Sequence, residues 1–267
     1  MTISKIILNK VFTPQNLKFK REDFYIKIHG YGKNKEWADE IIKTADLAAS
    51  LIQRNTSGEN VLKIITHGVK NANQHVIETS KKLYTGILRN VRQGWKSHCS
   101  DLTTRYSYKT YKSYESRIDK MKGIDITVPE KGLGVTKPSI VDGEKQVIHG
   151  SYTTINNSLD YIFKLYKNLF PKYLNKNLTE KNLEDINLTI AEIRWVLAQS
   201  TPWMRGSDSI ANVFIRAIYK ALGIKTFPLK KGVSLDLEAF CTSLKDYKTN
   251  FTNYFEKNPV VIKNNSK

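Results

Sequence analysis

One short segment of the sequence carries side chains suited to binding a phosphate group: Thr201-Pro202-Trp203-Met204-Arg205-Gly206-Ser207-Asp208-Ser209. Pro202 disfavours helix in the residue before it, and Ser207, Asp208 or Ser209 can cap a new helix. The first turn of that helix presents unpaired amides and the positive end of the helix dipole. Arg205 adds a guanidinium that can bind phosphate through two hydrogen bonds. The segment is therefore predicted to bind an anion.

Two residues at or near this loop are candidates for proton transfer. Asp208 is the only carboxylate of the loop, and its alternative role is to cap the helix. His149 is the one histidine that we expect to reach the loop. Arg205 has an alternative too, an ion pair with a carboxylate such as Glu192. The catalytic candidates are thus Asp208 and His149, and the predicted ligand-binding residues are Trp203, Arg205, Gly206, Ser207 and Ser209.

Two helices must position the loop. Apolar residues recur every three or four positions from Leu183 to Leu197, which predicts a buried helix over 184–198. Seven apolar positions at the same spacing predict a second helix over 208–222, and Gly223 is expected to end it. These two helices are expected to pack together at the centre of the molecule.

The other predicted elements surround this pair. Glycines and prolines separate two short β-rich runs, 124–128 and 146–149, which predicts one hairpin inside residues 123–150. A mainly α fold follows, with a helical region carrying a short strand at 1–122, a core at 123–257 and a loose tail at 258–267. The remaining segments expected in it are a strand at 23–28 and helices at 35–54, from 68 or 71 to 90, and at 159–171.

Composition indicates a globular protein with a strong positive charge. The chain of 267 residues is 40% hydrophobic and has 43 basic against 25 acidic residues, a net charge of +18. No run approaches the roughly 18 to 20 apolar residues of a membrane span. The charge favours an anionic partner, although codon bias in an AT-rich genome is a second explanation. Residues 101–121 interleave tyrosines with basic residues, which suits either nucleic-acid binding or an ordinary helix with solvated basic ends.

Other motifs do not predict a site. The glycines of 132–137 do not follow the order of a phosphate-binding P-loop. His98 and Cys99 are adjacent but have no paired ligands at metal spacing, and Cys99 and Cys241 are too isolated for a disulfide framework. No metal site is predicted.

The layout of residues 123–223 resembles the Fic family, also called Fic/Doc or Fido. In that family a β-hairpin flap and a buried helix precede a loop that reads H-P-F-x-D/E-G-N-G/K-R at the start of the next helix. Pro202 and Gly206 match this motif, and Trp203 keeps an aromatic residue at the position of the phenylalanine. The resemblance implies a Fic-like helical domain with a hairpin flap.

The departures from the Fic motif imply a different chemistry. Thr201 stands where the family has its catalytic histidine, and Arg205 replaces the acidic metal ligand. Ser207 and Ser209 replace the asparagine and arginine. A threonine hydroxyl is not a base at its ordinary pKa, and an arginine repels a metal ion, so ordinary AMP transfer is not expected.

A degenerate Fic fold resembles the AvrB-like bacterial effectors, which lack the motif and are associated with glycosyl transfer to host proteins. This implies a nucleotide or nucleotide-sugar donor, a protein hydroxyl as acceptor, and delivery into a host cell without a signal peptide. The bacterial cytoplasm is the alternative location. Two other functions remain open: a non-catalytic interaction module that binds an acidic partner, and a basic nucleic-acid-binding protein.

Overall fold

The computed structural model describes residues 17–28, 33–89, 103–105, 119–141 and 144–262. Within them the fold is mainly helical, as the sequence predicts, with a three-stranded antiparallel sheet of order β1-β3-β2 and a small sheet of β4 and β5. The elements are η2 (Arg21–Asp23), α1 (Lys35–Gln53), α2 (Gly58–Ala72), η3 (Asn73–His75), α3 (Thr79–Tyr84), β1 (Thr103–Arg105), β2 (Lys137–Val141), β3 (Glu144–Ile148), α5 (Tyr152–Tyr173), α6 (Glu180–Ser200), α7 (Ser207–Ala221), β4 (Ile224–Lys225), α8 (Leu235–Phe240), α9 (Leu244–Asn250), η5 (Phe251–Tyr254) and β5 (Val260–Val261).

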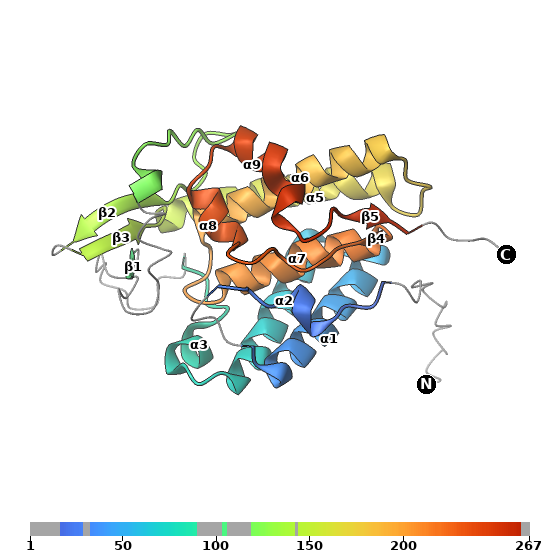
Figure 1. Ribbon diagram of the computed structural model, residues 1–267, viewed down its shortest axis with the longest axis horizontal. Helices are drawn as coiled ribbons and strands as arrows, with labels where there is room; N and C mark the ends of the chain where they lie inside the picture. The colour runs from blue at the N-terminus through green and yellow to red at the C-terminus, as the bar shows by residue number, and fades with distance from the viewer. Residues whose placement is uncertain (1–16, 29–32, 90–102, 106–118, 142–143, 263–267) are drawn as a thin grey trace, which may run out of the picture.

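Helix α7 is the centre of the molecule. Every residue from Ile210 to Ala221 is buried, so this helix has no solvent face beyond its first turn. Figure 1 shows α7 running between α1 and α2 on one side and α6 and α5 on the other, and the contacts of α7 with α1, α2 and α6 agree. The predicted helices 184–198 and 208–222 are confirmed as α6 and α7, packed against each other.

The two ends of α7 are both formed by glycines. Gly223 has φ of +74° just after the helix, as predicted for a terminating residue. At the other end the expectation of a serine or aspartate cap is wrong, because Gly206 is the N-cap and no side chain accepts from the first amides. Gly206 has φ of +85°, a backbone conformation that residues other than glycine rarely adopt.

The N-terminal helices differ in part from the prediction. Helix α1 confirms the one expected at 35–54. The helix expected from 68 or 71 to 90 is wrong: α2 already begins at Gly58, where Ser57 caps it, and ends at Ala72. The chain then turns because the buried Asn73 amide donates to Thr85 Oγ1 (2.7 Å). The apolar spacing could not reveal this side-chain bond.

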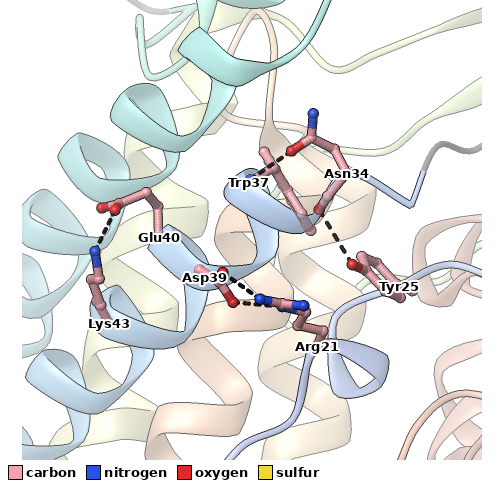
Figure 2. Close-up of polar contacts among 7 residues, drawn as sticks. All are labelled: Arg21, Tyr25, Asn34, Trp37, Asp39, Glu40 and Lys43. Atoms are coloured by element: carbon pink, nitrogen blue, oxygen red, sulfur yellow. Dashed lines mark hydrogen bonds and ion pairs between the residues drawn. The ribbon is translucent and has the colours of Figure 1, made fainter.

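The strand expected at 23–28 is not present among residues 17–28, which instead form the short helix η2 and an irregular segment. This segment pairs with no strand of the described residues, and side chains bind it to the start of α1, as Figure 2 shows. Arg21 pairs with Asp39 through two bonds of 2.7 Å, and the Tyr25 hydroxyl donates to the Asn34 carbonyl (3.3 Å). Burial of Phe24 and Tyr25 accounts for the apolar pattern that suggested a strand.

The hairpin predicted inside 123–150 is confirmed, but one of its strands lies elsewhere. Strands β2 and β3 pair from Lys137↔Ile148 onwards, and β1 occupies the other edge of β3. The run 124–128 forms no strand: its alternate residues pack on the hydrophobic core, and no strand of the described residues pairs with it. The alternation therefore reports one buried face and not strand pairing.

Three further expectations concern the ends and the rest of the chain. The tail expected to be loose from 258 is wrong in part, because Val260 and Val261 pair with β4. Most of the tyrosine-rich segment 101–121 lies outside the described residues, and the domain boundaries stay a prediction. None of the helices in the described part of the chain is both long and apolar enough to cross a membrane.

Candidate functional site

A cavity of about 420 Å³ lies at the junction of α6, α7, α8 and the N-terminal segment, within the range typical of ligand sites. It brings together all seven residues that the sequence predicts for the site: His149, Trp203, Arg205, Gly206, Ser207, Asp208 and Ser209. The far wall comes from the segment before α1, the start of α1 and the turn around Asn73, none of which the sequence placed at the site.

The loop between α6 and α7 is held by the segment 86–89. Arg89 N donates to the Pro202 carbonyl (2.9 Å), and Met204 N donates to the carbonyl of Ile87 (3.0 Å). Thr201 adopts a left-handed conformation with φ of +42°, and its hydroxyl donates to the Ala198 carbonyl (2.8 Å). The Thr201 side chain thus closes the end of α6, which is a structural role.

Ser207 also serves the loop more than the cavity. Its hydroxyl donates to the carbonyl of Trp203 (2.9 Å) and accepts from the amide of the same residue (3.1 Å). The single hydroxyl hydrogen is therefore committed to the turn. An anion at this end would meet the backbone amides of the first turn of α7, whose N-cap supplies no side-chain acceptor.

Arg205 lies at the rim of the cavity. Its side chain is 44% exposed, and Nη2 is 3.9 Å from a carboxylate oxygen of Glu78. The carboxylate that it faces is thus Glu78 and not Glu192, which instead binds Tyr161 and Lys248. An exposed pair at this distance contributes little stability, so Arg205 remains able to turn toward an anion.

Arg194 of α6 is a buried cation that lines the cavity, and the sequence did not point to it as a site residue. Its side chain is fully buried, and Nη2 donates to Asp208. Nε and Nη1 have no hydrogen-bond partner among the described residues. A buried guanidinium with unpaired N–H groups is costly, so such donors call for an acceptor in the cavity. The available signal was an arginine inside the apolar run Ile193-Arg194-Trp195-Val196.

Asp208 is the acidic partner of this arginine. Burial, and after it the negative charge of the neighbouring Asp236, raise the pKa of its carboxyl, Arg194 opposes both effects, and the resulting pKa is about 7. The Asn212 amide donates to its second oxygen (3.1 Å). A carboxyl group with this pKa can give or take a proton near neutral pH.

His149 enters the cavity from the base of the hairpin. It is buried, and its Nδ1 lies 3.0 Å from the hydroxyl oxygen of Thr136. Burial and the positive charge of Arg89 lower the pKa of its imidazole well below the usual range. His149 is therefore neutral at physiological pH and can accept a proton.

Aromatic side chains form much of the remaining wall: Phe24, Tyr25, Trp37, Trp203 and Phe240. Phe24 and Tyr25 come from the segment before α1 and Trp37 from α1 itself, and Figure 2 shows Tyr25 and Trp37. Trp37 is fixed by a bond from its indole N–H to Asn73 Oδ1 (2.8 Å). Rigid aromatic faces suit a planar ring or a sugar. No group of three or more His, Cys, Asp or Glu residues able to hold a metal ion occurs in the described ranges.

Residues 136–258 match the model of the AvrB_AvrC family, described as an avirulence protein. The match runs from the residue before β2 to a point between η5 and β5, and it includes both catalytic candidates and Arg194. It supports the AvrB-like part of the resemblance, whereas the Fic assignment stays a prediction. No curated protein matches the chain.

Proposed function

We propose that this protein is a bacterial effector that binds a nucleotide or nucleotide sugar in the cavity and transfers part of it to a hydroxyl group of a host protein. The similarity of residues 136–258 to avirulence proteins supports the effector role. The observation that carries the proposed chemistry is Arg194, a fully buried cation beside the first turn of α7 whose Nε and Nη1 find no partner among the residues that the structure describes.

The phosphate groups of the donor would lie between Arg194 and the amides of Ser207–Ser209. Both features are positive: Nε and Nη1 of Arg194 have no acceptor among the described residues, and the N-cap Gly206 supplies no side-chain acceptor to the first turn of α7. A phosphate would satisfy them together, with charge-assisted hydrogen bonds that are strong in a buried site. The aromatic wall with Trp37 and Tyr25 would then receive the base or the sugar.

The proposed transfer uses two titratable groups that line the cavity, His149 and Asp208. Nε2 of the neutral His149 accepts the proton of the acceptor hydroxyl, whose oxygen attacks the electrophilic carbon or phosphorus of the donor. The bond from that atom to the leaving phosphate oxygen breaks, and the electron pair stays on this oxygen. Arg194 stabilises its charge, and Asp208, when protonated, donates a hydrogen bond or a proton to it.

An exposed apolar surface beside the cavity would receive the protein acceptor. Ile77 is 98% exposed and Leu83 is 59% exposed, and between them Glu78 and Lys81 line the cavity. Exposed apolar groups next to a ligand site are typical of docking surfaces. The same observation favours the second candidate function, a non-catalytic module that only binds a partner here.

The test is a thermal-shift screen with nucleotides and nucleotide sugars, because a ligand at 100 times its Kd stabilises a protein by about 2.7 kcal/mol. We expect stabilisation by a diphosphate-bearing compound and its loss in Arg194→Lys, which keeps the charge but not the planar set of donors. Lys172→Ala, at an exposed site on α5, is the matched control. No stabilisation by any such compound would refute the proposal and leave the interaction module.

A further inference from the structure

Thr136 and His149 face each other at the base of the hairpin. The first pair of the β2–β3 ladder is Lys137↔Ile148, so these two residues occupy the next positions beyond it. The side chain of Thr136 is also bound to the last turn of α6, where its hydroxyl donates to the backbone carbonyl of Gln199 (2.9 Å). All three residues are buried.

The orientation of the Gln199 amide is fixed from both ends. Its Oε1 accepts from the backbone amide of Thr136 (3.0 Å), and its Nε2 donates to the carbonyl of Ala239 (2.8 Å). A reversed amide would place a donor against a donor and an acceptor against an acceptor. The two contacts therefore agree on one arrangement and hold Thr136 between α6 and the hairpin.

The count of hydrogens then assigns the tautomer of His149. A carbonyl oxygen can only accept, so the single hydroxyl hydrogen of Thr136 goes to the Gln199 carbonyl. The Thr136 oxygen has only lone pairs to offer His149 Nδ1, 3.0 Å away, so Nδ1 must bring the hydrogen. In a neutral imidazole the other nitrogen, Nε2, then carries the lone pair.

We infer that Thr136 is a positioning residue, which holds His149 in the tautomer protonated on Nδ1 so that Nε2 is the nitrogen that accepts a proton. Only the role of Nε2 as the base that accepts the hydroxyl proton rests on the proposed function; the tautomer itself does not. In the opposite tautomer two lone pairs would face each other at 3.0 Å, and Nε2 would already carry a hydrogen.

Close packing leaves this arrangement little freedom. A Cβ on Gly150 would lie 2.9 Å from the Cα of Gly134, and one on Gly134 would lie 2.8 Å from the Cα of Ser200. Real Cβ atoms do not approach other atoms so closely, so the two legs of the hairpin contact each other and the end of α6 through bare backbone. The geometry around Thr136 is thus fixed by backbone on both sides.

The experiment is long-range ¹H–¹⁵N correlation spectroscopy of the histidine side chains in the full chain, which separates a protonated from an unprotonated ring nitrogen without a substrate. The signals of His149 are identified as those missing in His149→Gln. We expect a neutral ring with its hydrogen on Nδ1 in the wild type and in Thr136→Ser. Thr136→Val lacks the acceptor, which would leave a buried Nδ1–H unpaired, so there the hydrogen is expected to move to Nε2.

Either of two results would overturn the inference: a wild-type hydrogen on Nε2, or a hydrogen that stays on Nδ1 in Thr136→Val. The wild-type result does not depend on any Thr136 variant, and Thr136→Ala replaces the valine variant if that one does not fold. A transfer activity that is unchanged in His149→Gln would refute the proposed function instead, because the tautomer is read independently of activity.

Discussion

Binding of an anionic donor at Arg194 is expected to weaken as the pH rises above about 7. The carboxyl of Asp208 has its pKa raised to about 7, mainly by burial, and it shares Arg194 with the proposed ligand. A phosphate beside this carboxyl would disfavour its ionised form further, so Asp208 would take up a proton when the ligand binds. Below pH 7 the Asp208 carboxyl already carries its proton, so ligand binding needs no proton uptake and the Kd does not depend on this group.

The expected size follows from linkage. Above the pKa of the free protein, uptake of one proton makes the Kd rise by up to about tenfold for each pH unit, since one unit of pKa corresponds to about 1.4 kcal/mol. Asp208→Asn removes the titrating group and its negative charge, while the amide oxygen can still accept from Nη2 of Arg194. This variant should therefore bind the ligand with a Kd that does not rise with pH, and more tightly than the wild type above pH 7.

The assay is calorimetric titration across this pH range with the nucleotide sugar that stabilises the protein most. A nucleotide sugar is chosen because its phosphates are diesters and lack the second ionisation near pH 6 of a phosphate monoester. Asp185→Asn, at the other end of α6 and exposed, is the matched control and should keep the wild-type pH dependence. A wild-type Kd that is constant across this range, or an equal slope in Asp208→Asn, would refute the reasoning.

Three further predictions concern the loop, the histidine and the departure from the Fic motif. Gly206→Ala should lower the free energy of unfolding in urea by about 1–3 kcal/mol, because φ is +85° and the new Cβ would lie 2.9 Å from Thr85 Cγ2. Gly223→Ala has φ of +74° but open space, so it should cost only about 1 kcal/mol; equal losses would contradict the steric part. His149 has a lowered pKa in the folded state, so the wild type should lose stability as the pH falls below about 6.5, and His149→Gln should lose less; parallel pH curves would argue against this. With Mg²⁺ and labelled ATP no AMP should be incorporated into protein, and incorporation that disappears in Thr201→Ala would show that the loop retains the Fic chemistry.

The sequence predicts the centre of the fold well and its periphery less well. Helices α6 and α7 were predictable because burial on most sides forces apolar residues into nearly every turn. The segment 23–28 and the run 124–128 carry similar apolar patterns, yet both pack on the core and neither pairs with a strand in the part of the chain that the structure describes. An apolar pattern reports burial of a face, and the pairing that makes a strand depends on residues far away in the chain.

The candidate site was predictable where its residues are adjacent in sequence and not where the fold assembles them. The loop 201–209 and His149 could be selected by residue type, and they line one cavity. Arg194 could not be recognised as a ligand-facing cation, since only the structure shows its unpaired nitrogens. Thr136 is an ordinary residue of a glycine-rich segment until its three hydrogen bonds are known.

In the proposed mechanism the base and the buried cation lie outside the loop that resembles the Fic motif. Thr201 and Ser207 stand at motif positions, but their hydroxyl hydrogens are donated to backbone carbonyls and hold the loop in shape. In the proposed mechanism the base comes from the hairpin through His149 and the cation comes from α6 through Arg194. Both are buried and tied to the helical core, so neither depends on the rim, where Arg205 is solvated. A site arranged in this way is expected to lose its ligand on changes in α6 and to tolerate changes at Arg205.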